Sequence, residues 1–133
     1  MYCLDSNVVI DAISKNTSSL LLPHFQSLEP NEICIPSIVV AELEYGAQHS
    51  KDYDNNIKIV NAFIAPFKII SFTENEAFIY GKIREDLAKN GNLIGPNDLL
   101  IAATALANNF LLVTHNTDEF SRVKELKIED WRK

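Results

Sequence analysis

The stretch GPNDLLIAATALA, residues 95–107, contains the most apolar part of the chain and decides the fold class. Gly95-Pro96 interrupts the preceding sequence, and proline suits the first turn of a helix. From Leu99 to Ala107 only Thr104 is polar, so the predicted helix is apolar on nearly every face and should be central and buried. Leu111-Leu112-Val113 follows as a short buried strand. The segment therefore predicts a core helix that leads into a core strand.

The same alternation of apolar strands and helices extends toward the N-terminus. Ser37 is expected to cap one helix, a Thr73-x-x-Glu76 capping box to open the longest one, and Gly91 to end it. Alternating elements of this kind predict a parallel sheet covered on both faces, in a single α/β domain over residues 1–133. The predicted strands are 2–4, 33–35 and 68–72, and the predicted helices are 8–15, 18–28, 37–48, 54–65 and 73–90.

Composition limits the class of protein further. Hydrophobic residues make up 47% and charged residues 23%, which excludes intrinsic disorder. No apolar stretch approaches the roughly 20 residues that span a bilayer, and the N-terminus lacks the basic start of a signal peptide. We therefore expect a cytoplasmic protein that does not contact the membrane. The net charge of −6 argues against a non-specific nucleic-acid coat but leaves local nucleic-acid binding open.

Cysteine and histidine residues do not suggest a metal site. Cys3 and Cys34 both lie in predicted strands and are expected to be buried reduced thiols. The chain has no CxxC motif and no Cys/His spacing for zinc, and its three histidines are scattered.

Three acidic residues occupy unusual places in this pattern. Asp5 ends the first predicted strand, and Asp98 opens the apolar helix. Glu42 lies mid-helix on a mostly apolar face, whereas Glu44 should face solvent. Asn116, Asp118 and Glu119 directly follow the strand that ends at Thr114. Ligands of parallel sheets collect at the carboxyl ends of the strands, so these positions are candidates for a site.

Each of these residues also has a simpler interpretation. Asp5 is a possible helix cap, Asp98 a first-turn acid favoured by the helix dipole, and Glu42 a surface partner for a lysine. Asn116 and Asp118 are typical turn residues. The sequence alone leaves these alternatives open for each residue.

The simpler interpretations weaken when the three acids are considered as a group. Two carboxylates about 4 Å apart repel by roughly 4 kcal/mol at an effective dielectric constant of 20. A divalent cation removes that cost, and an all-carboxylate site favours Mg²⁺, or Mn²⁺ in its place, over zinc. The pattern predicts a magnesium site.

The chain resembles the PIN-domain ribonucleases, specifically the VapC toxins of bacterial toxin–antitoxin pairs. The resemblance rests on four motifs in family order: MYCLDSNVVID (1–11), IPSIVVAELEYG (35–46), GNLIGPNDLLIAATALANN (91–109) and LLVTHNTDEFSRVKELKIEDW (111–131). Ser6 replaces the usual threonine of the first motif. Asn116 occupies the position of a fourth acid in many PIN domains, so Glu119 is the candidate for that role.

The resemblance implies a three-layer α/β/α fold with a mostly parallel central sheet. It implies that Asp5, Glu42 and Asp98 bind the metal and that these three acids and Glu119 form the catalytic set. It also implies a VapB-like antitoxin as partner, operator DNA bound only through that antitoxin, and a homodimer. Supporting hydrogen bonds are expected from Ser6, Asn7, Asn97, Thr114 and Asn116.

The expected reaction is metal-dependent hydrolysis of RNA by an activated water, which leaves a 5′-phosphate and a 3′-hydroxyl. The resemblance suggests structured RNA, in particular initiator tRNA cut in its anticodon loop. Attack by the RNA 2′-hydroxyl normally needs histidine acid–base groups, and only His115 lies near the site. Candidate phosphate contacts are Lys82, Arg84, Lys89, Arg122, Lys124 and Lys127.

Two other classes of function compete with this one. A receiver-like signalling domain phosphorylated on Asp5 would need a lysine at the end of a central strand, and none is predicted there. A catalytically inactive interaction module is the other alternative. It would retain buried carboxylates that only destabilise the fold.

Overall fold

A computed structural model describes residues 1–133 and contains one five-stranded sheet in which every strand pairs in parallel. The strands are β1 (Tyr2–Leu4), β2 (Ile33–Pro36), β3 (Lys68–Ile70), β4 (Leu111–Val113) and β5 (Ile128–Glu129). Their order across the sheet is β3-β2-β1-β4-β5. The chain thus moves outward from β1 on one side and returns to the other side for β4. That reversal creates a topological switch point between β1 and β4.

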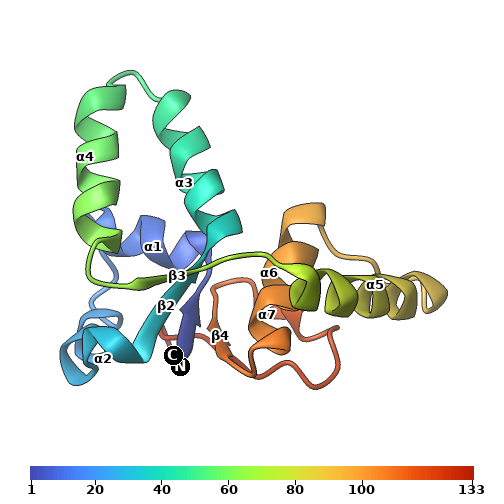
Figure 1. The fold of residues 1–133 in the computed structure, drawn as a ribbon. Helices are drawn as coiled ribbons and strands as arrows, with labels where there is room; N and C mark the ends of the chain where they lie inside the picture. Colours follow the sequence, from blue (N-terminus) through green and yellow to red (C-terminus); the bar gives the residue numbers. More distant parts are fainter.

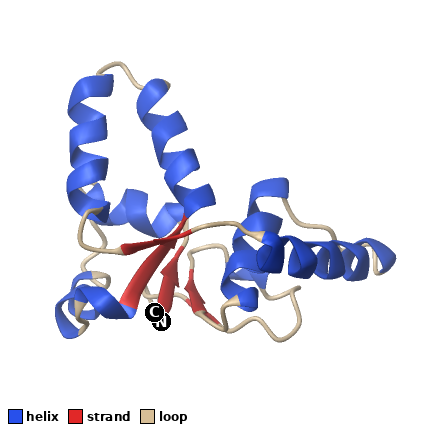
Figure 2. Cartoon of the chain, viewed as in Figure 1, coloured by secondary structure: helices blue, strands red, loops and turns tan.

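Helices flank the sheet on both sides, as the α/β prediction requires (Figure 2). In Figure 1, α3 and α4 form a hairpin that extends away from the strands, and α5 and α6 lie on the other side of the molecule. None of these helices is both long and apolar enough to span a membrane. The helices are α1 (Ser6–Ile13), α2 (Leu22–Ser27), α3 (Ser37–Gln48), α4 (Tyr53–Ile64), α5 (Glu74–Lys89), α6 (Pro96–Ala107) and α7 (Thr117–Phe120), with a 3₁₀ turn at Pro30–Glu32.

Helix α6 is the buried helix that its sequence predicts. Six of its residues are buried, including Thr104, whose hydroxyl donates to the Leu100 carbonyl at 2.8 Å. Its length is packed against α5, which the Thr73–Glu76 capping box opens as expected. Gly91, at φ +63°, follows the end of α5 in the left-handed region that glycine tolerates best. This hairpin of α5 and α6 fixes the N-terminus of α6 at the edge of the sheet.

Several predicted boundaries are wrong. Ser37 is the first residue of α3 rather than its cap, because Pro36 holds the cap position and makes no side-chain bond. The predicted helix 18–28 is reduced to α2, since residues 18–21 form a turn ahead of Pro23. The strand predicted to reach Phe72 ends at Ile70, where its pairing with β2 ends.

The segment after β4 contains more structure than its sequence suggests. It holds α7 and the edge strand β5, neither of which the sequence analysis identified. Two residues of strand carry too short a pattern to be recognised without the neighbouring β4. Trp131 is buried and stacked on His24 with ring centroids 4.7 Å apart. Cys3 and Cys34 are free, buried and paired in register on β1 and β2.

Candidate active site

Asp5 lies at the switch point, between the ends of β1 and β4. Its backbone N–H donates to the Val113 carbonyl at 2.9 Å, which joins the two strand ends. One carboxylate oxygen caps α1 by accepting from the Ser6 N–H at 2.8 Å, and the other accepts from the Thr114 hydroxyl at 2.7 Å. Asp5 therefore is the helix cap of the simpler interpretation and, with the same carboxylate, a member of the acidic group.

Burial raises the pKa of the Asp5 carboxyl, and the hydrogen bond from Thr114 opposes that shift. The side chain is 3% exposed, so its negative charge has little water around it. Glu42 adds like charge nearby, which raises the pKa further.

Asp98 and Glu119 form a pair of carboxyl groups joined by a shared hydrogen bond. Burial, followed by that bond, raises the pKa of Asp98 to about 8, whereas the same bond lowers the pKa of Glu119. Asn116 lies between them: its side-chain amide donates to Glu119 at 2.7 Å and lies 3.5 Å from an Asp98 oxygen. At neutral pH the pair therefore holds a proton, with Asp98 as the donor.

Glu42 projects from α3 toward this group from the β2 side. Its Oε2 is 3.4 Å from the side-chain amide of Asn97, and its Oε1 is buried with no hydrogen-bond partner. The basic members of the structure's ion pairs are His115 and Arg132, and their partners are Asp11 and Asp130. Glu42 therefore has no lysine partner at the surface. Glu44 is half-buried, contrary to expectation, because it contacts Gln48 and the Tyr53 hydroxyl.

The chemical type of the four acidic side chains suits a hard divalent cation. They offer only oxygen ligands, and the unpartnered oxygen of Glu42 is the type of group that a cation satisfies. Electrostatic coupling links Asp98 to Asp5, to Glu42 and to Glu119, so the four carboxyl groups share one region. No three of them are already close enough together to hold an ion, and binding would have to draw them inward.

The remaining polar residues predicted for this region differ in whether and how they contact the acids. Thr114 contacts Asp5 directly, and its hydroxyl also accepts from the Asn116 N–H at 2.9 Å. Ser6 touches Asp5 only through its backbone N–H. Asn7 contacts none of the acids, since its side-chain oxygen accepts from the His115 N–H at 3.2 Å.

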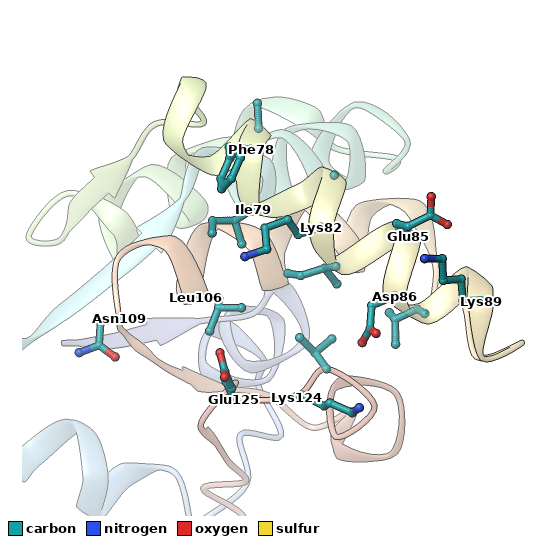
Figure 3. A pocket seen from close by; sticks show the side chains of 15 residues that line it. Phe78, Ile79, Lys82, Glu85, Asp86, Lys89, Leu106, Asn109, Lys124 and Glu125 are labelled. Atoms are coloured by element: carbon teal, nitrogen blue, oxygen red, sulfur yellow. The ribbon is translucent and has the colours of Figure 1, made fainter.

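Among the predicted phosphate-binding residues, Arg122 lies close enough to Glu119 for its charge to lower the pKa of that carboxyl. Lys82 and Lys124 line a groove of about 1120 Å³ between α5 and residues 123–125, and none of the acids lines it (Figure 3). Arg84 donates to the Tyr80 hydroxyl, whereas Arg122 reaches the Leu93 carbonyl in the loop before α6. The lining is balanced in charge, with Lys82, Lys89, Glu85 and Asp86 on the α5 wall and Lys124 and Glu125 on the opposite wall.

Sequence reasoning missed a second polar cluster beside the acids. His115 lies between Asp11 and Asp130, and Arg132 joins Asp130 to the His115 carbonyl. Asp130 and Arg132 flank the apolar Trp131 in the sequence, but they lie in a turn, and no periodic pattern marks them.

Comparison with known proteins shows the family to which the chain belongs. The family model for the PIN domain matches residues 2–126. The chain is 41% identical to Ribonuclease VapC2 of Rickettsia felis, covering 100% of this chain and 99% of the relative. It is 35% identical to the tRNA(fMet)-specific endonuclease VapC of Shigella flexneri, and the match covers 98% of this chain and 97% of the relative.

A solved structure gives the same result for the fold. The crystal structure of VapBC2 from Rickettsia felis bound to a promoter DNA fragment contains a chain that matches with a TM-score of 0.90 at 40% identity, covering 98% of both chains. The family model matches nearly the whole chain, and the relatives are 35% to 41% identical over nearly their full length. The chain belongs to the PIN-domain family and, within it, to the VapC proteins.

Proposed function

We propose that this chain is a magnesium-dependent endoribonuclease and the toxin of a toxin–antitoxin pair. The observation that carries the proposal is the acidic group at the switch point. Asp5 is buried, Asp98 retains a proton at neutral pH, and one oxygen of Glu42 is buried without a partner. Such an arrangement is unfavourable by itself, and a divalent cation held by these three residues offsets the cost.

The chain's own residues prepare the site for phosphodiester hydrolysis. Thr114 orients Asp5, Asn97 orients Glu42, and Asn116 holds Glu119 beside Asp98. A bound Mg²⁺ supplies Lewis acidity, lowering the pKa of water and offsetting the charge that develops on the phosphate. Glu119 remains ionised next to Asp98 and takes the catalytic position that a fourth acid holds in many PIN domains. Hydrolysis by water leaves a 5′-phosphate and a 3′-hydroxyl.

The proposed substrate is initiator tRNA, cut in its anticodon loop. A relative that is 35% identical over nearly the full chain is named as a tRNA(fMet)-specific endonuclease. Solved relatives are complexes of VapB with VapC, which supports a VapB-like antitoxin as partner. We propose that the chain reaches operator DNA only through that antitoxin. The protein should be toxic when produced alone in its host and harmless with its partner.

The test is digestion of end-labelled initiator tRNA and elongator methionine tRNA by the purified chain. We expect one cut in the initiator anticodon loop with Mg²⁺ or Mn²⁺ and no cut with a chelator. A chain with Asp98→Asn serves as the control and defines the background level of cleavage. Cleavage that persists in the chelator would refute metal dependence. Failure to cleave any RNA would favour the inactive interaction module.

The receiver-like alternative finds no support in the structure. It needs a lysine at the end of a central strand, but β1, β2 and β4 are followed by Asp5, Ser37 and Thr114.

We also propose a homodimer that uses apolar surface on the α3–α4 hairpin. Tyr45 on α3 is 67% exposed and Ile59 on α4 is 41% exposed. Light scattering at micromolar concentration should therefore give twice the monomer mass of 15.0 kDa. A mass of one chain under these conditions would remove this proposal.

Metal affinity should depend on pH through Asp98. Its carboxyl, with a pKa of about 8, must release a proton before it binds a cation. Mn²⁺ affinity should therefore rise between about pH 6 and about pH 8, by up to about tenfold per pH unit, and level off above. Calorimetry in buffers of different ionisation enthalpy should detect about one proton released per ion at the acidic end.

The apo protein should show the corresponding trend in stability. The folded chain keeps a proton on Asp98 that the unfolded chain releases above about pH 4, so this group destabilises the fold increasingly as pH rises toward about 8. In Asp98→Asn, the pH dependence of Mn²⁺ affinity and the pH dependence of stability should both be smaller. An affinity that is constant over this range would contradict the assignment of Asp98.

A further inference from the structure

His115 is the best-connected side chain near the acids that the proposed reaction does not use. Its ring is 13% exposed, and its Nε2 lies 3.0 Å from an Asp11 carboxylate oxygen on α1. Its Nδ1 is buried without a hydrogen-bond partner and faces Asp130 Oδ1 at 3.8 Å. The backbone is held as well, because the His115 N–H donates to Asn7 and its carbonyl accepts from Arg132 at 3.2 Å.

Arg132 and Asp130 form a tightly constrained pair. The guanidinium donates through Nε to one Asp130 oxygen at 3.1 Å and through Nη2 to the other at 3.0 Å. The Arg132 backbone N–H adds a third bond at 2.9 Å. These bonds lower the pKa of the Asp130 carboxyl, so it is ionised at neutral pH although its side chain is 5% exposed. Two-pronged binding of this kind fixes orientation as well as distance.

Packing explains why this pair faces His115. Trp131 is 1% exposed and stacks on His24, and β5 pairs with β4 just before it. After β5 the chain turns, with the Lys133 N–H donating to the Asp130 carbonyl at 3.2 Å, and in this turn Trp131 packs inward while Arg132 contacts Asp130. The family model matches only residues 2–126, so both members of the pair lie outside the matched segment.

His115 stands directly between two residues that contact the acids. Thr114 donates to Asp5, and Asn116 donates to Glu119 and approaches Asp98. Any rotation of the backbone at His115 therefore moves both contacts together. We propose that Asp11, His115, Asp130 and Arg132 (the His115 network) are positioning residues that hold Thr114 and Asn116 in register with the acidic group. The proposal rests on the proposed ribonuclease function only for its kinetic consequences.

The test compares Arg132→Gln with Lys133→Gln. Both variants remove one positive charge from adjacent positions, but no Lys133 side-chain contact is present. Arg132 is 40% exposed, so its replacement should leave the fold intact. Arg132→Lys keeps the charge without the two-pronged geometry and should restore function only in part.

The first readout does not depend on activity. In the metal-free protein, the side-chain amide signals of Asn116 in a ¹H–¹⁵N spectrum, assigned by their loss in Asn116→Asp, should shift in Arg132→Gln and stay in place in Lys133→Gln. Unchanged Asn116 signals in Arg132→Gln would overturn the proposal, because the network would then only anchor residues 128–132.

The second readout is kinetic. In Arg132→Gln we expect kcat to fall about tenfold with KM changed less than about twofold, and Mn²⁺ affinity to weaken. A fall in melting temperature without a change in kcat or Mn²⁺ affinity would overturn the positioning role. Should the unmodified chain cleave no RNA, the proposed function fails, while the Asn116 signals still decide for or against the network.

Discussion

Replacing Asp98 with asparagine should nearly abolish RNA cleavage and leave the fold at least as stable as before. Asparagine keeps the shape of the side chain, and its amide can donate to Glu119 in place of the carboxyl proton that Asp98 now provides. It removes one charged metal ligand, so cleavage should fall at least about a hundredfold, which corresponds to about 2.7 kcal/mol. Stability should hold or rise because the folded chain no longer has to keep a carboxyl protonated at a pH where the unfolded chain releases the proton.

A helix-end acid without a catalytic role predicts the opposite pattern. Loss of a favourable first-turn charge on α6 would cost roughly 0.3–1 kcal/mol of stability and leave cleavage intact. Cleavage rate, Mn²⁺ affinity and melting temperature should therefore be measured together on both chains. Cleavage within about twofold of the unmodified chain, or unchanged Mn²⁺ affinity, would exclude Asp98 from the site.

The second large effect is expected at Glu42, with Glu44 as its matched control on the same helix. Glu42→Gln should reduce cleavage by about ten- to a hundredfold and weaken Mn²⁺ binding, because it removes the charge next to Asn97. Glu44→Gln removes the same charge two residues away. Its contacts are with Gln48 and Tyr53 in the α3–α4 hairpin, so cleavage should stay within about twofold. Equal losses in both variants would indicate a general charge effect instead of a metal ligand.

Much of the site was predictable because its residues carry local signals. Asp5 ends an apolar strand, Asp98 opens a helix that is apolar all round, and Glu42 lies on the apolar face of its helix. Each departure from the expected polarity is visible within one or two turns of sequence. The general rule for parallel sheets then places strand-end acids at one edge. Family motifs added the roles of these residues, which polarity alone left open.

Other contacts of the site were not predictable from local pattern. Which strand end lies next to Asp5 depends on the order β3-β2-β1-β4-β5, which joins Thr114 to Asp5 across 109 residues. The raised pKa of Asp98 depends on the burial of its carboxyl and on its hydrogen bond with Glu119, both of which are set by packing. The prediction that Glu44 faces solvent failed for the same reason, since α4 brings Tyr53 against it.

The sequence by itself determined all the helices and strands except α7 and β5, and it identified the acids, because hydrophobic period and helix-end chemistry are local properties. Tertiary structure alone decided that β5 pairs with β4, that Trp131 is buried, and that Asp130 and Arg132 meet His115. Segment 128–132 carries too few residues for a period to emerge, and its conformation comes from the strand and aromatic rings it packs against. Long-range pairing is selected by total burial over the whole domain, which no single stretch of the chain encodes.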